Sequence, residues 1–351
     1  MKKLFNATIL IILSISYIRA GEYRGYANQM YILWQPNARA EALGRGYSTL
    51  TGNPFYAIYN PASTAFNTDL TVSFSQLKPN LFFSNKPRYN SIGVNYYDMH
   101  YGAFALNVLN FSWGEEFLSV DPTGDTIDKS IPQTNIYILN YSNKIMEDFT
   151  AGINLNYFRD DFGNKDLSAF AFDLGLLKKI SISENPLSQN LLLGLSLSNI
   201  LNAEVELDGQ IDVLPSILRL SAAYNFVNQK NGLLPFAADL SIFAEYKDIV
   251  NAKYYTECKI GSELSLFNLV VLRGGYYYEW RNDYGYSRNA GRISELTYGF
   301  GIRIPFSEYI KTFPLEMKID YSNLPTPIYN QDFEKAYKQY NVFSVIVNYS
   351  I

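Results

Sequence analysis

Side chains that commonly carry enzyme chemistry are scarce in this sequence. Its 351 residues include a single histidine, His100, and a single cysteine, Cys258. A hydrolase that works through a histidine base needs that histidine within reach of a nucleophile. His100 instead lies in the turn-like stretch 98–102, where Asp, Gly and a polar ring are ordinary. Cys258 stands between Glu257 and Lys259, and we interpret it as a small packed side chain. We therefore predict no enzymatic activity and name no catalytic residue.

The same counts exclude several other classes of site. A chain with one Cys and one His cannot form an intramolecular disulfide, a zinc finger or an iron–sulfur site, so we predict no metal and no cofactor. The formal net charge is -4, and the sequence shows no basic stripe. Nucleic acid is therefore not an expected partner.

Residues 1–20 have the pattern of a secretory signal peptide. Lys2 and Lys3 precede an apolar run from Leu4 to Ile18, and Ala20 is a suitable last residue before cleavage. The alternative is a membrane anchor, but the run is shorter than the roughly 20 apolar residues of a spanning helix. We predict that the mature protein leaves the cytoplasm.

Most of the remaining chain alternates between apolar and polar residues, as half-buried strands do. In 313–322 the apolar positions are Phe313, Leu315, Met317, Ile319 and Tyr321. Strands are predicted at 68–77, 89–97, 102–112, 132–142, 149–160, 168–180, 190–200, 214–226, 234–246, 254–265, 268–279, 293–304, 313–322 and 341–351. These are about 14 strands, most of them close to the 9–11 residues with which a tilted strand crosses a bilayer.

Long connections alternate with short ones along this series of strands. The long ones follow the odd-numbered strands, as in 113–131 and 323–340, which is typical of an outer-membrane barrel with its long loops outside the cell. A secreted sandwich or propeller would also alternate, but its strands would be shorter, with a mode of about 5–6 residues. We predict an all-β fold, in which residues 68–351 form a transmembrane antiparallel β-barrel in the bacterial outer membrane.

In such a barrel the apolar face contacts outer-membrane lipid and the polar face lines the lumen. Charges of both signs fall on the polar face: Asp173, Arg219, Asp239, Glu245, Arg303, Glu316, Lys318 and Asp320. We interpret them as a structural charge network, and the alternative is a polar conduit or ligand site. A lumen of mixed charge speaks against an apolar conduit. About fourteen strands also enclose more space than their own side chains fill, so a plug is expected.

Residues 21–67 do not alternate and are the candidate hatch, or plug. A short helix is predicted at 38–43, ended by Gly44 or Gly46, and the triplet Asn60-Pro61-Ala62 follows a turn at 51–54. The predicted hatch motif consists of Ala38, Arg39, Ala40, Leu43, Gly44, Asn60, Pro61 and Ala62.

This motif resembles the N-terminal signature of the PorV/PorQ family of outer-membrane proteins, within the wider FadL-like group of barrels. The resemblance continues through Phe172-Asp173-Leu174-Gly175-Leu176, the strand 193–199 and Tyr298-Gly299-Phe300-Gly301. It implies a fourteen-stranded barrel with an N-terminal hatch.

Two functions follow from the resemblance. The PorV/PorQ type implies that the protein binds or shuttles secreted cargo in type IX secretion. Its partners would then be the translocon, the attachment complex and the C-terminal domains of cargo, with loops 113–131 and 323–340 as the contact surface. The alternative is a FadL-like transporter, which would carry fatty acids or other hydrophobic molecules through a lateral opening in the barrel wall.

Overall fold

The computed structural model describes residues 37–66, 70–78, 87–114, 116–120, 126–161, 166–183, 188–207, 210–228, 236–251, 256–280, 292–306, 314–325 and 339–349. The predicted signal peptide lies outside these residues, and so do the predicted hatch up to residue 36 and most of the cargo loop 323–340.

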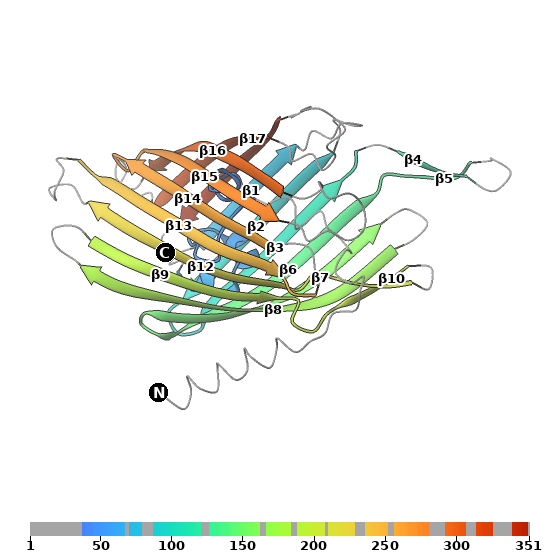
Figure 1. Ribbon diagram of the computed structural model, residues 1–351, viewed down its shortest axis with the longest axis horizontal. Coiled ribbons are helices and arrows are strands. Elements are labelled where there is room, and N and C mark those ends of the chain that lie inside the picture. Colours follow the sequence, from blue (N-terminus) through green and yellow to red (C-terminus); the bar gives the residue numbers. More distant parts are fainter. Residues whose placement is uncertain are drawn as a thin grey trace.

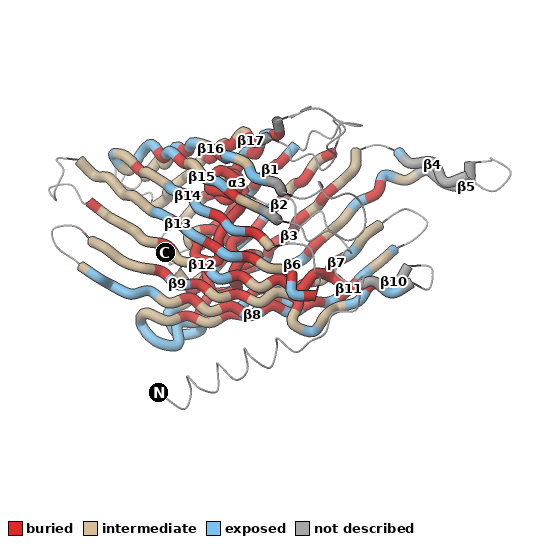
Figure 2. Tube along the Cα trace, viewed as in Figure 1, coloured by how far each residue is buried: buried red, intermediate tan, exposed pale blue. Residues whose placement is uncertain are grey.

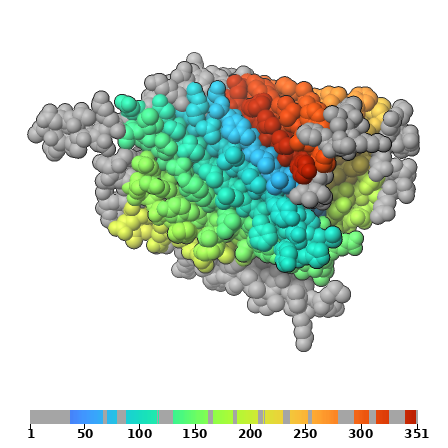
Figure 3. Space-filling view, turned by 180° about the vertical axis from the view of Figure 1, so that it is seen from behind, coloured from blue at the N-terminus to red at the C-terminus, as the bar shows by residue number. Residues whose placement is uncertain are grey.

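Fourteen antiparallel strands form one closed barrel, which confirms the predicted fold class (Figure 1). In barrel order the strands are β1 (Leu70–Lys78), β2 (Arg88–Asp98), β3 (Gly102–Ser112), β6 (Gln133–Met146), β7 (Phe149–Asp161), β8 (Asp166–Ser183), β9 (Ser188–Ser198), β12 (Ile217–Asn228), β13 (Ala238–Ile249), β14 (Thr256–Leu266), β15 (Val270–Trp280), β16 (Arg292–Pro305), β17 (Leu315–Pro325) and β18 (Gln339–Tyr349). β18 pairs with β1 from Leu70↔Tyr349 to Lys78↔Asn341 and closes the barrel, so both ends of the strand series lie side by side in Figure 3.

Two predicted loops contain hairpins that the sequence did not reveal. β4 (Phe117–Val120) pairs with β5 (Thr126–Ser130), and β10 (Glu204–Leu207) pairs with β11 (Gln210–Val213). Figure 1 shows both hairpins at one end of the barrel, which we call the loop end; the opposite end, with the short turns 99–101, 147–148 and 267–269, is the turn end.

Two predicted strand starts are too early by three or more residues. β13 begins at Ala238 rather than at residue 234, and β12 begins at Ile217 rather than at residue 214. Pro215 has no N–H for a ladder, and the backbone N–H of Leu214 bonds to Ala203 O at 2.9 Å instead. The chain therefore joins the barrel only after this connection.

The two faces of the wall differ as the alternation predicts. In β1 the side chains of Val72 and Phe74 are 39% and 43% exposed on the outside, whereas Ser73 and Ser75 are buried. Each of the fourteen strands pairs with two neighbours around a closed barrel, and an apolar belt covers its outside, which is the arrangement that a bilayer requires. Among the described residues, no helix has the length and apolar character needed to cross a membrane.

Alternation corrects the interpretation of Cys258, whereas His100 lies where it was predicted. Cys258 is exposed rather than packed, because its neighbours Glu257 and Lys259 are the buried, inward-facing residues of β14. His100 lies in the β2–β3 turn as expected, where its backbone N–H donates to Asp98 Oδ1 at 2.7 Å.

Residues 37–66, which we call the inner segment, lie inside the barrel. They form α3 (Ala38–Ala42) and the 3-10 helices η1 (Pro54–Ile58) and η2 (Pro61–Phe66). Asn37 caps α3 by accepting from the N–H groups of Arg39 and Ala40, and Asn53 caps η1 in the same way. Figure 2 shows the buried residues concentrated in the middle of the barrel, where α3 lies.

Inward-facing glycines let the inner segment approach the wall at backbone distance. At Gly275 a Cβ would overlap the carbonyl carbon of Leu43 and the amide of Gly44, and at Gly175 it would overlap Asn60 and Pro61. Comparable overlaps with the inner segment occur at Gly152, Gly194, Gly261 and Gly299. The wall is thus shaped to fit this segment.

We predict that Gly275→Ala destabilises the protein and Gly274→Ala does not. The two glycines are neighbours in β15, but a Cβ on Gly274 would meet only Thr297 O, at 3.9 Å. Overpacking at Gly275 costs about 1–3 kcal/mol. The temperature at which the folded barrel loses its fast mobility in unboiled gel samples measures the effect; equal midpoints for the two variants would contradict the close fit.

Candidate functional site

The α3 part of the hatch motif is anchored to several strands. The backbone N–H of Ala38 donates to Ser344 Oγ in β18 at 2.8 Å, and Thr297 Oγ1 in β16 donates to Ala42 O at 2.9 Å. Ala40 and Leu43 are fully buried in one apolar cluster with Phe243 of β13. After Leu43 the chain turns at Gly44, whose φ of 94° suits glycine.

Asparagines anchor the second part of the motif. Asn60 Nδ2 donates to Ser48 O at 2.8 Å and to Leu176 O in β8 at 2.9 Å, while its Oδ1 accepts from the N–H of Ala62 at 3.0 Å. From the wall, Asn140 donates to Pro61 O at 2.9 Å. Asn107 and Asn154 likewise donate to carbonyl oxygens of η1. Side-chain amides thereby satisfy backbone groups that the short helices leave unpaired.

One charge network joins α3 to the wall. Arg39 contacts Glu263 of β14 through two hydrogen bonds, at 2.7 and 2.8 Å. Glu263 also pairs with Arg273 of β15, and Arg273 pairs with Asp320 of β17 at 2.7 Å. Burial alone would lower the pKa of Arg39, but the adjacent Glu263 raises it above its ordinary value, so Arg39 stays charged.

A second network lies across β12, β13 and β14. Arg219 pairs with Glu245 at 3.0 Å, Lys259 bridges Glu245 and Glu257, and Lys247 pairs with Glu257 at 2.8 Å. The inner segment takes part, because Ser48 N donates to Glu245 at 2.6 Å and Lys259 donates to the carbonyl oxygens of Arg45 and Gly46.

The predicted lumen charges therefore fall into separate groups. Asp173, Arg219, Glu245 and Asp320 are buried in the lumen. Asp239, Arg303, Glu316 and Lys318 lie at the turn end and are only partly buried, with Lys318 and Glu316 in contact at 2.9 Å. The sequence analysis missed partners in both networks, namely Glu263, Arg273, Lys247, Glu257 and Lys259. Glu257, Lys259 and Glu263 could have been predicted from the sequence, because in an alternating strand β14 they share the face opposite to Cys258.

The loop-end half of the lumen contradicts the expectation of a wall of mixed charge. There most inward-facing side chains of β2, β3, β6 and β7 are apolar: Tyr89, Leu109, Phe111, Ile136, Ile138 and Phe158. The ion-paired charges of the lumen lie on other strands, mainly β12 to β15. Counting charges along the sequence did not reveal this division, because it depends on which strands are neighbours.

A pocket, which we call the inner pocket, lies between this apolar wall and the inner segment. Its walls are Ile58, Tyr89, Leu109, Ile136, Ile138, Phe158, Ala171 and Ile217, and its polar groups belong to Asn156, Asp173, Ser198, Asn199 and Arg219. The cavity volume is about 30 Å³. At the roughly 10–15 Å³ that one water molecule needs, this is room for only about two of them, so the pocket is nearly closed in this state.

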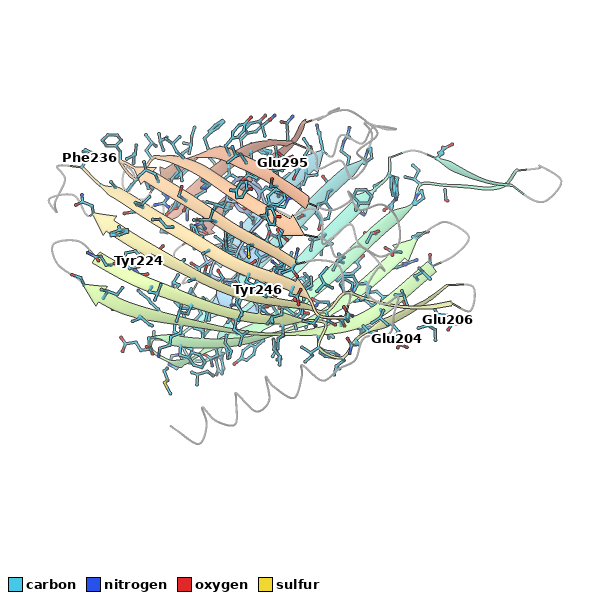
Figure 4. The ribbon with its side chains drawn as sticks, in the orientation of Figure 1. Glu204, Glu206, Tyr224, Phe236, Tyr246 and Glu295 are labelled. Carbon is cyan, nitrogen blue, oxygen red and sulfur yellow. The ribbon has the colours of Figure 1, made fainter. Side chains whose placement is uncertain are left out.

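The barrel wall changes beside the inner pocket. β9 ends at Ser198, and its ladder with β8 begins only at Leu174↔Leu197. In the described strands, 166–173 of β8 pair with β7 alone, and the connection to the β10–β11 hairpin follows, with Ile200 N donating to Phe172 O at 2.9 Å. Figure 4 labels Glu204 and Glu206 of this hairpin at the loop end, far from Tyr224 and Phe236 at the turn end.

Other sites for chemistry are not evident. In the ranges that the structure describes, no group of three or more His, Cys, Asp or Glu could hold a metal ion. The His100 side chain is exposed on its turn, 3.7 Å from Asp98.

No protein-family model matches the sequence, and no curated protein matches it. The barrel is similar to solved outer-membrane channels. The Pseudomonas putida toluene transporter TodX is 12% identical at a TM-score of 0.48, with 91% of this chain and 100% of that chain covered. The Ralstonia pickettii toluene transporter TbuX is 10% identical at a TM-score of 0.46, with 92% of this chain and 100% of that chain covered. A Pseudomonas aeruginosa FadL homologue is 13% identical at a TM-score of 0.45, with 90% of this chain and 98% of that chain covered. Likeness at this level decides neither family nor function.

We predict that Arg39→Ala loosens the inner segment. The variant leaves Glu263 with Arg273 as its remaining cation. The Arg39–Glu263 pair is partly buried, with side-chain exposures of 19% and 13%, so we expect a cost between those of surface and buried pairs, about 1–3 kcal/mol. Arg159→Ala is the matched control, since Arg159 pairs with Asp166 at 2.7 Å in an exposed position at the loop end. Limited proteolysis of folded barrels should cut within 37–66 faster in Arg39→Ala only. Equal cleavage rates would show that the network does not hold the segment.

Proposed function

We propose that this protein carries apolar small molecules across the outer membrane, with the inner segment as its hatch. The single observation that supports the proposal is the inner pocket. It has apolar walls inside a barrel whose inner face is otherwise largely polar. Apolar walls with a few convergent polar groups are the usual make-up of a small-molecule site.

The position of the pocket also fits transport. It lies on the loop-end side of the inner segment, where a molecule arriving from outside would enter, if the long loops face outward as in known barrels. Ile58 of η1 is part of its wall, so the hatch itself contacts the pocket.

Passage requires movement. Sites for drug-sized ligands have volumes of about 300–1,000 Å³, whereas this cavity has about 30 Å³. The state described here is therefore the closed one, and the contacts between hatch and wall that must rearrange are those of Arg39 with Glu263, Asn60 with Leu176 and Ser48 with Glu245.

The break beside β9 is the proposed lateral route. Asp173, Ser198, Asn199 and Ile217 line the inner pocket and also flank the place where β8 loses its ladder partner. The β10–β11 hairpin follows at this place, and its Val205 packs into the same apolar cluster as Ala171. Outward movement of the hairpin would open the pocket toward the lipid.

The type IX role rests on the sequence resemblance alone. The loop 323–340, which would contact cargo, lies mostly outside the described residues, and the β4–β5 hairpin is the only described structure in the loop 113–131 apart from its first residues. Recovery of a translocon subunit or of secreted proteins with a shared C-terminal domain, after mild-detergent affinity isolation, would favour that role over transport.

We predict that Ala171→Phe abolishes uptake while Ala151→Phe preserves it. Ala171 is a buried pocket residue of β8, whereas Ala151 alternates with the inward-facing residues of β7 and lies on the lipid side. Both changes add the same volume, but only the first fills the pocket. Uptake of radiolabelled dodecane into proteoliposomes should fall at least about tenfold for Ala171→Phe, a barrier of about 1.4 kcal/mol. Unchanged uptake would exclude the pocket from the route.

A further inference from the structure

The polar end of the inner pocket contains an unused donor and an unused acceptor. Among the described residues, Arg219 Nε and Asn156 Oδ1 have no hydrogen-bond partner. Both side chains are at least nine-tenths buried, at 3% and 4% exposure, and both line the inner pocket. A buried polar atom without a partner costs about 1–3 kcal/mol, so a ligand that satisfies it gains affinity.

Several neighbouring polar atoms are already bonded. Asp173 accepts from Asn154 Nδ2 at 2.9 Å, Asn156 Nδ2 at 2.7 Å and the backbone N–H of Asn199 at 2.8 Å. Arg219 NH1 donates to Glu245 at 3.0 Å, and the guanidinium carbon lies 5.5 Å from the centre of the Tyr59 ring. Within the described ranges, the buried donor and acceptor that lack partners at this point are thus Arg219 Nε and Asn156 Oδ1, beside the hydroxyl of Ser198.

The local charges disfavour an anion. Arg219 shares its positive charge with Glu245, and Asp173 places a carboxyl group in the same pocket. A carboxylate could accept from Arg219 Nε, but it offers no proton to Asn156 Oδ1 and would stand near Asp173. A hydrocarbon would satisfy neither atom. A hydroxyl group both donates and accepts, and the carbon chain attached to it enters the pocket once the hatch has moved, since the closed cavity has only about 30 Å³.

We infer that the inner pocket selects neutral apolar molecules with one hydroxyl group, that is, long-chain alcohols or phenols. The hydroxyl oxygen accepts from Arg219 Nε and its proton goes to Asn156 Oδ1, while the carbon chain lies along the apolar wall of Tyr89, Leu109 and Ile138. This inference rests on the proposed function, because it names the substrate class of the same pocket.

The test compares three ligands of equal chain length on the purified full-length barrel: 1-dodecanol, dodecane and dodecanoate. Binding is measured by equilibrium dialysis, and each value is divided by the partition of the same ligand into protein-free micelles. We expect the alcohol to bind at least about tenfold more strongly than either other ligand, which corresponds to about 1.4 kcal/mol. Equal binding of all three, or preference for dodecanoate, would overturn the inference and leave the polar end to ordered water.

Variants locate the effect. Asn156→Leu and Arg219→Lys each remove one of the two atoms and should reduce the preference for alcohol over dodecane to about twofold or less. Asn190→Leu is the control, since Asn190 is an asparagine of β9 near the turn end that bonds to Asn225 at 2.8 Å outside the pocket. Variants that keep the full preference would also overturn the assignment.

The outcome is distinguishable from failure of the proposed function. If dodecane enters proteoliposomes through the barrel but the alcohol has no advantage, transport stands and the hydroxyl preference falls. If none of the three ligands binds or enters, the proposed function falls as well.

Discussion

The space inside a fourteen-stranded barrel is the constraint on which the rest of this structure depends. Such a lumen is too wide for its own side chains to fill, and a membrane protein cannot leave its wall half packed. The inner segment resolves this by lying against the wall at backbone distance, at glycines such as Gly175 and Gly275. Wall asparagines and two charge networks then satisfy the polar groups that this close packing buries, which is why so many polar residues are buried in a barrel of modest charge content.

The same packing divides the lumen into a charged side and a largely apolar side. Charged groups concentrate on β12 to β15, where they bind the inner segment through Glu245, Lys259 and Glu263. The strands on the opposite side present apolar side chains at the loop end and leave the inner pocket. In the proposed transport function this closed pocket is the resting state, and the contacts that hold the inner segment against the wall are those that close the route.

Sequence alone predicted the fold because strand alternation is a local signal. Each of the fourteen strands was placed from its own residues, and the start of β12 was misplaced only because Pro215 carries no mark of where the ladder resumes. The site was harder to predict, since it depends on neighbours that are distant in sequence. Arg39 was identified from a motif, but Glu263 contacts it across 224 positions, and the apolar wall appears only when β2, β3, β6 and β7 are placed side by side. The exposure of Cys258 could have been predicted locally. Its neighbours Glu257 and Lys259 are charged and face the lumen, so in an alternating strand Cys258 faces outward.

The central claim is that the inner segment must move for apolar molecules to pass. Its most direct test is a reversible lock in a Cys258→Ser background, with the pairs Thr49→Cys/Ser221→Cys and Thr64→Cys/Ser142→Cys. The hydroxyl oxygens of these pairs lie 2.9 and 2.6 Å apart, so the thiols can form disulfides between the segment and the wall. We predict that oxidised proteoliposomes take up no labelled dodecane above protein-free vesicles and that reduction restores uptake. Full uptake through the oxidised, doubly locked barrel would contradict the account.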